Sequence, residues 1–78
     1  MADAPVRRFP APWAVVETDG GYAVDDVNGQ RLAYFYARKD PNSARQAGVL
    51  TMDEARRMAI NFSRLPELLR RAATPPTP

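Results

Sequence analysis

The sequence predicts an α+β domain built as a three-stranded antiparallel meander followed by one C-terminal helix, in the order β-β-β-α. Stretches rich in β-branched and aromatic residues alternate with short glycine-containing turns, which is typical of antiparallel hairpins. A capping-box motif then introduces apolar residues at helical spacing. The chain of 78 residues is long enough for one small domain.

The three predicted strands are each bounded by residues that favour turns. They span residues 13–18, 22–27 and 30–39. A turn at Asp19–Gly21 joins the first two strands. Asn28–Gly29 suits two positive φ angles and predicts a two-residue type I′ turn before the third strand. The segment 40–48 contains proline, asparagine and glycine, so a loop is predicted there.

The predicted helix begins at Thr51, which stands three residues before Glu54 in the capping-box pattern. Its apolar residues recur at spacings of three and four, which places them on one face. These residues are Ala55, Met58, Ala59, Phe62 and Leu65. Pro66 lacks a backbone N–H group and disfavours helix at the residue before it, so the next segment is a kinked continuation or a separate final turn. A short helical extension is therefore expected after Pro66.

Composition divides the chain into an arm, a domain and a tail. Residues 1–11 contain two prolines and the pair Arg7 and Arg8, which predicts an extended N-terminal arm. Residues 12–71 form the predicted single domain. Residues 72–78 end in TPPTP and are expected to be disordered.

The predicted register assigns the strand side chains to two faces of the sheet. The face given to the helix carries Trp13, Val15, Tyr22, Val24, Ala33, Phe35 and Ala37. The opposite face carries Val16, Ala23, Asp25, Leu32, Tyr34 and Tyr36. A three-residue first turn would exchange the faces of the first strand alone. Because one helix cannot cover both sides, the second face is expected to be partly exposed, to fold under the arm, or to meet a partner.

The composition excludes most kinds of catalytic chemistry. The chain has no histidine and no cysteine, so it lacks the commonest general base and any thiolate site. The adjacent Asp25 and Asp26 point to opposite faces of a strand and cannot share a proton or a metal ion. No base is available to activate a serine or threonine, and there is no glycine-rich phosphate loop. We expect no enzyme activity, no cofactor and no metal site.

Five arginines are candidate basic contacts. They are Arg7, Arg8, Arg31, Arg56 and Arg57. The net charge is only +2, and acidic residues are interleaved with the helix arginines, so a solvated helix face with intrahelical ion pairs is favoured over a phosphate-binding ridge. Asp25 on the open sheet face would also repel phosphate.

The open face is the candidate interaction surface, represented by Val16, Leu32, Tyr34 and Tyr36. The leading hypothesis is a small non-catalytic binding or interaction module, whose partner is a second copy of the chain or another protein. The alternative is a nucleic-acid-binding domain that uses the sheet face and the basic arm. No apolar run is long enough to span a membrane and no secretory signal is recognised, so a cytoplasmic location is expected.

The segments FPAPW, GGYAVDDVNGQRLAYFYAR and LTMDEARRMAINFSRLPELL resemble a family of small uncharacterised alphaproteobacterial proteins. The likeness covers about residues 9–69 and is most specific in the NGQ-LAY, LT-DEARR and LPELL patterns. It implies a bacterial protein and carries over no activity. The β-β-β-α order is also similar to the arm-type DNA-binding domains of phage integrases, although fold alone does not fix function. This chain departs from those domains by placing Asp25 on the candidate reading face and by lacking a basic strand there.

Overall fold

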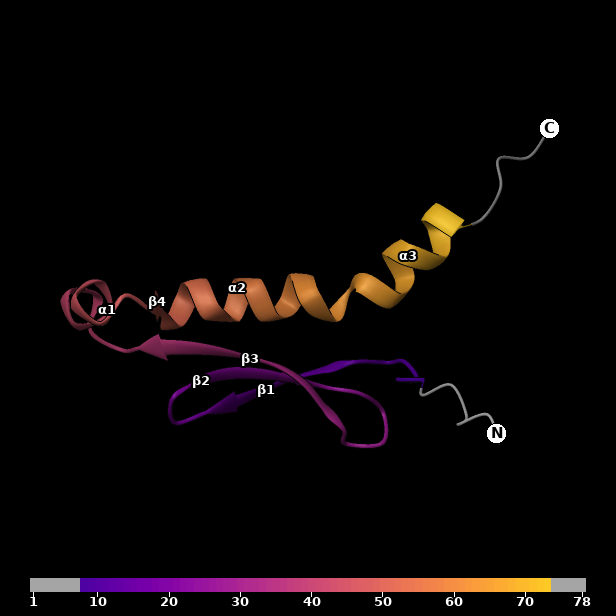
Figure 1. The fold of residues 1–78 in the computed structure, drawn as a ribbon, viewed down its shortest axis with the longest axis horizontal. Coiled ribbons are helices and arrows are strands. Elements are labelled where there is room, and N and C mark those ends of the chain that lie inside the picture. The colour runs from indigo at the N-terminus through magenta and orange to yellow at the C-terminus, as the bar shows by residue number, and fades with distance from the viewer. Residues whose placement is uncertain (1–7, 74–78) are drawn as a thin grey trace, which may run out of the picture.

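The computed structural model describes residues 8–73, which fold as an α+β domain with a four-stranded sheet in the order β1-β2-β3-β4 (Figure 1). The predicted meander is confirmed as β1 (Ala14–Thr18), β2 (Gly21–Asp25) and β3 (Arg31–Arg38). The prediction of three strands omitted β4 (Leu50–Thr51), which pairs in parallel with the end of β3. A strand of two residues is too short to produce a recognisable alternation in the sequence.

A short helix, α1 (Pro41–Ala47), occupies the segment predicted to be a loop. Asp40 caps this helix by accepting a hydrogen bond from the Ser43 N–H at 3.0 Å. Pro41 stands in its first turn, and Gly48 ends it in the left-handed region with φ of 70°. These are the normal signals of helix ends. The loop prediction was wrong because the ends of a seven-residue helix leave little room for an apolar pattern between them.

The main helix, α2 (Met52–Ser63), begins as predicted with a complete capping box. The Glu54 N–H donates to Thr51 Oγ1 at 3.2 Å, and the Thr51 N–H donates to Glu54 Oε1 at 2.9 Å. The segment after it forms a separate helix, α3 (Leu65–Ala73), because Pro66 has no N–H group to continue the α2 ladder. Figure 1 shows α3 turning away from the sheet.

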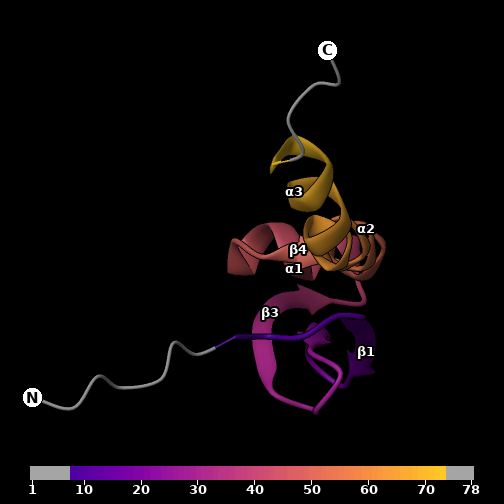
Figure 2. The same ribbon diagram turned by 90° about the vertical axis from the view of Figure 1, so that its right-hand side faces the viewer.

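The interior of the domain lies between α2 and one side of the sheet, and small side chains dominate it. Figure 2 shows the helices gathered on that side. The apolar residues buried at this contact are Val24 and Ala37 on the sheet and Ala55 and Ala59 on α2, whereas the buried Ala44 belongs to α1 and the buried Ala23 lies on the other side of the sheet. Alanines on the helix and on the strands allow the two backbones to approach closely, so tight contact rather than large side chains fills this space.

Aromatic rings close one end of the interior. Phe62 of α2 stacks on Trp13 with ring centroids 5.5 Å apart and meets the edge of Phe35 at 6.0 Å. Met58 belongs to the apolar helix face that the sequence predicted, but half of its surface is exposed. The face of α2 that meets the sheet is centred on its two buried alanines, which leaves Met58 at the margin of the contact.

The register of the meander agrees with the prediction at its centre. Val24 lies opposite Val15 on one side and Ala33 on the other, and Tyr22 lies opposite Phe35. The first turn has two residues, Asp19 and Gly20, since Thr18 pairs with Gly21, so the structure selects the two-residue alternative over the three-residue one. The helix-facing row of side chains could therefore be assigned from the sequence.

The β2–β3 turn differs from the predicted type I′ turn, because Asn28 does not adopt a positive φ angle whereas Gly29 does, at 86°. Residues 27–29 form the loop, closed by the Asp26 N–H donating to the Gln30 carbonyl at 2.9 Å. The buried Asp26 carboxylate accepts the N–H groups of Asn28 and Gln30 at 2.9 and 2.8 Å. A bulge between Val24 and Asp25 then restores the predicted register.

Part of the predicted organisation lies outside the described residues. This applies to residues 1–7 of the predicted arm and to residues 74–78 of the predicted tail, whereas residues 72 and 73 belong to α3. Within residues 8–73, no helix combines the length and the apolar character needed to cross a membrane.

Enlarging Ala59 should destabilise the domain, because its side chain is fully buried where α2 meets the sheet. Ala59→Leu is expected to lower the free energy of unfolding by about 1–3 kcal/mol through overpacking. Asn61→Leu adds a similar side chain at an exposed position of the same helix and should change stability by less than about 0.5 kcal/mol. Urea unfolding of both variants measures the difference, and equal stabilities would show that α2 does not approach the sheet through Ala59.

Removing the cap of α2 should also be measurable. Thr51→Ala is expected to lower the free energy of unfolding by about 1 kcal/mol, since the Glu54 N–H loses its acceptor. Thr51→Asp should be nearly neutral, because aspartate also caps and its charge suits the helix dipole. If both variants lose the same large amount in urea unfolding, the hydroxyl is not acting as a cap.

Candidate interaction surface

The sheet side that faces away from α2 carries a surface that we call the tyrosine face. It consists of Val16, Thr18, Tyr34 and Tyr36, with the fully buried Ala23 between them. Ala23 of β2 lies opposite Val16 of β1 and opposite Tyr34 of β3, and cross-strand partners share a face of the sheet. Figure 2 shows that the described helices leave this side uncovered. The shared face that the sequence predicted for the two tyrosines is therefore present.

Tyr34 is held in place by the β1–β2 turn. Its hydroxyl forms a hydrogen bond with the Thr18 hydroxyl, which donates in turn to the Gly21 carbonyl at 3.2 Å. Gly20 leaves room for this approach, because a Cβ atom there would lie 3.2 Å from the Tyr34 hydroxyl oxygen, which is a tight contact. The half-buried ring of Tyr34 thus has a fixed orientation.

Tyr36 leans on Tyr34 and is otherwise open to solvent. The two ring centroids are 4.7 Å apart at an interplanar angle of 51°. Tyr36 is 68% exposed, the largest exposed fraction among the large apolar and aromatic side chains of the described residues. The face therefore presents one anchored ring and one outward ring, and the anchored ring limits where the outward one can lie.

The end of this face nearest the β2–β3 turn is neutralised by an ion pair. Arg31 Nε donates to Asp25 Oδ1 at 2.9 Å and Arg31 Nη2 donates to Oδ2 at 3.3 Å. The hydrogen bond from this guanidinium lowers the pKa of Asp25 from its ordinary value. Arg31 was predicted as a basic contact and Asp25 as a source of repulsion, but in the folded domain the two charges compensate each other.

Leu32 is not part of the tyrosine face, although the sequence placed it there. The bulge beside Asp25 adds one residue to β3 and turns Leu32 toward the helix side. There it lines a cavity of about 410 Å³ together with Phe9, Trp13 and Phe62. Simple alternation along β3 could not reveal this change, because nothing in the sequence of the strand marks the bulge.

The described part of the arm also lies at this end of the sheet, away from the tyrosines. Trp13 Nε1 donates to the Phe9 carbonyl at 2.9 Å, and the Val27 N–H donates to the Pro10 carbonyl at 3.1 Å. Residues 8–12 are thereby tied to the β2–β3 turn and to the start of β1. Among the described residues, the arm does not cover Tyr36.

The other predicted basic contacts do not form a common patch. Arg56 and Arg57 approach Asp53 at 3.6 and 3.0 Å, which is the intrahelical pairing that the sequence favoured. Arg8 is exposed at the beginning of the described residues. Arg7 lies outside them.

Two cations that the sequence reading passed over adjoin the tyrosine face. Arg38 stands two residues after Tyr36 in β3 and so shares its side of the sheet, and Lys39 follows directly. Both are exposed and line a hollow of about 410 Å³ beside Tyr36. Within residues 8–73, neither side chain has an ion-pair partner. The alternation of residues 34, 36 and 38 was the signal that could have identified Arg38.

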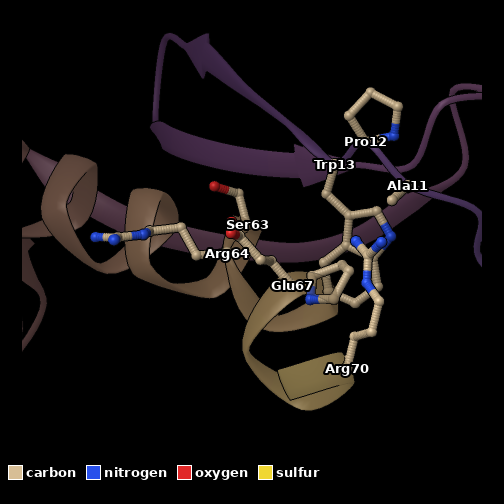
Figure 3. A pocket seen from close by; sticks show the side chains of 8 residues that line it. Ala11, Pro12, Trp13, Ser63, Arg64, Glu67 and Arg70 are labelled. Atoms are coloured by element: carbon tan, nitrogen blue, oxygen red, sulfur yellow. The ribbon is translucent and has the colours of Figure 1, made fainter. Parts of the chain in front are cut away.

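A larger cavity, of about 480 Å³, lies where the arm meets the junction of α2 and α3 (Figure 3). Trp13 lies at one end of it, and Arg70 reaches toward that end from α3, whereas Arg64 points away. Glu67 and Arg70 are both engaged in other interactions. The cavity therefore offers no free charged group aimed at a ligand, and it is a weaker candidate site than the tyrosine face. Residues 8–73 contain no cluster of three or more acidic, histidine or cysteine side chains arranged to hold a metal ion.

No family model, curated protein or solved structure matches this chain. The resemblances to the alphaproteobacterial family and to the integrase arm domains therefore stay predictions. What the surface can bind has to be inferred from its own geometry and charge.

The Asp25–Arg31 pair should make a contribution to stability that is lost only in acid. Because the folded-state pKa of Asp25 is lowered, this contribution is complete above the ordinary aspartate value of about 4 and disappears as the pH falls through the lowered value. Asp25→Asn should therefore be slightly less stable than the wild type at neutral pH and equal to it in strong acid. Urea unfolding across this pH range measures the difference, and a difference that does not change with pH would contradict the assignment.

Proposed function

We propose that this protein is a small non-catalytic interaction module that binds a protein partner through the tyrosine face. The observation that carries the proposal is the position of Tyr36, a residue that is 68% exposed on a sheet side that the described helices leave open. Tyrosine suits interfaces because its ring buries a large apolar area while its hydroxyl tolerates water. The proposal covers two kinds of protein partner, which are a second copy of the chain and a different protein.

The rigidity of the surface supports a binding role. Tyr34 is anchored through Thr18 to the β1–β2 turn, and Tyr36 rests against its ring. A side chain that is already held near its bound position loses less conformational entropy on association. Two flexible tyrosines of the same area would bind more weakly.

The distribution of charge argues against the nucleic-acid alternative. Arg31, Arg56 and Arg57 are each engaged with a carboxylate. Phosphate binding by these groups would have to replace ion pairs that already exist, and each replacement reduces the electrostatic gain. Only one ring of the tyrosine pair is open enough to accept a stacked base.

The non-catalytic part of the proposal rests on composition. The chain lacks histidine and cysteine, and the two adjacent aspartates perform structural tasks. Asp25 pairs with Arg31, and Asp26 accepts hydrogen bonds from the β2–β3 loop. Neither is available as a general acid or base without loss of those contacts.

Site-specific photo-crosslinking tests the interaction surface directly. A benzophenone amino acid at position 36 should give a defined crosslinked product in cells, whereas the same group at the half-exposed position 58, outside the tyrosine face, should not. Tyr34 and Thr18 are left intact, so the anchored ring remains. Crosslinks that are equal at both positions, or present only at position 58, would remove the tyrosine face as the binding surface.

A stability measurement separates binding from folding. Tyr36→Ala should change the free energy of unfolding by less than about 1 kcal/mol, because the ring is mostly exposed. The tagged Tyr36→Ala protein should also fail to capture the partner that crosslinking at position 36 identifies. Sedimentation equilibrium of the wild type then identifies the partner class: a mass that rises with concentration and returns to the monomer value in Tyr36→Ala indicates a second copy.

A further inference from the structure

We infer that the hollow beside Tyr36 receives an acidic side chain from an extended segment of another protein that lies across the tyrosine face. This inference rests on the proposed function and specifies the chemistry of the partner. The hollow has a volume of about 410 Å³, which is large enough for a side chain but small for a folded element. Its lining consists of Asp19, Gly20, Tyr36, Ala37, Arg38, Lys39 and Val49.

The walls of the hollow come from three separate segments that the fold holds together. One wall is the β1–β2 turn, whose Gly20 carbonyl accepts the Ala37 N–H at 2.9 Å. A second wall is the end of β3, and Val49, just before β4, supplies the third. Because a backbone hydrogen bond joins the turn to β3, the mouth of the hollow is set by the sheet.

The charge of the hollow calls for an anion. Arg38 and Lys39 are exposed neighbours with no ion-pair partner in the described part of the chain. Asp19 is the one acidic group in the lining, which leaves one positive charge in excess. Asp40, the next residue along, is charged as well but does not line the hollow, and its carboxylate caps α1. An incoming carboxylate would relieve the repulsion between the two cations and gain charge-assisted hydrogen bonds.

The spacing along β3 defines the order of the partner's side chains. Tyr36 and Arg38 stand two residues apart on the same side of the strand, which corresponds to about 6.6 Å. An extended segment has the same two-residue repeat. A segment with an aromatic residue two positions from an acidic one can therefore pack the first on Tyr36 and bring the second to Arg38.

A protein segment fits this surface better than a nucleic acid does. Arg38 and Lys39 are only two cations, and Asp19 stands at the same hollow. A polynucleotide would bring several phosphates past Asp19 and past the neutralised Asp25 end of the face. A peptide can place one carboxylate at the cations and apolar atoms elsewhere.

The test is a titration of the full-length isotope-labelled chain with the end-blocked peptide Ser-Glu-Ser-Phe-Ser-Glu-Ser, followed by NMR. Its symmetrical order places a glutamate two positions from the phenylalanine in either strand direction. We expect saturable shifts at the backbone amides of Tyr36, Arg38 and Lys39. Replacing both glutamates by glutamine should weaken binding by about tenfold. Equal affinity of the glutamine peptide would overturn the inference.

Charge reversal in the protein gives the matched comparison. Arg38→Glu with Lys39→Glu should weaken peptide binding by more than about tenfold, whereas Arg8→Glu with Arg64→Glu, which makes the same change in net charge elsewhere, should weaken it by less than about threefold. Arg38→Gln with Lys39→Gln provides a milder version should the charge-reversed chain fail to fold. Equal losses in the two charge-reversed pairs would show that only net charge matters and would overturn the site.

The outcomes distinguish this inference from the function on which it rests. Absence of peptide binding together with crosslinking at position 36 overturns the acidic segment and leaves the tyrosine face as an interaction surface. Tighter binding of an oligothymidylate than of the peptide, lost in the Arg38 and Lys39 variants, overturns both in favour of nucleic acid. Peptide binding that is lost in Tyr36→Ala and weakened by added salt supports both.

Discussion

The close approach of α2 to the sheet is the interaction on which the rest of this structure depends. The buried side chains on the helix are Ala55 and Ala59, and those they face on the sheet include Val24 and Ala37. Such small groups bury little area individually, so the contact stabilises the domain mainly by bringing two backbones to short range and excluding voids. Larger rings at Trp13, Phe35 and Phe62 then seal one end. A domain this small has few further apolar residues with which to cover the second face of its sheet.

Because the contact with α2 covers only one side of the sheet, the other side stays uncovered. Its organisation shows how an exposed aromatic surface can still be ordered. Tyr34 is anchored by hydroxyl contacts to the β1–β2 turn, where glycine leaves room for it. Tyr36 rests on Tyr34, and Arg38 continues the same side of β3. Order in this surface therefore comes from local hydrogen bonds and ring contact, and needs no second hydrophobic layer.

Charged residues divide into two groups with different roles. Asp25 with Arg31, and Asp53 with the two arginines of α2, form ion pairs within the domain; the first pair is neutral, and the second group keeps one positive charge. Arg38 and Lys39 have no such partners in the described residues, and they stand beside the most exposed tyrosine. Composition alone treats all these cations alike. Their positions relative to carboxylates separate those that are paired within the domain from those without an ion-pair partner in the described residues.

The sequence by itself determined the meander, its central register and the start of the main helix. These features depend on local chemistry: alternation along strands, the glycine-containing turns between them, and the reciprocal capping of Thr51 and Glu54. Only the tertiary structure decided which side Leu32 occupies, that Met58 is half exposed, and that residues 50–51 join the sheet as β4. Each of these depends on a bulge, a helix rotation or a long-range pairing, and such features arise from packing between distant segments rather than from any residue pattern. The tertiary structure also decided that Asp25 pairs with Arg31 and that Arg38 has no ion-pair partner in the described residues. An ion pair exists only where the fold brings two side chains together.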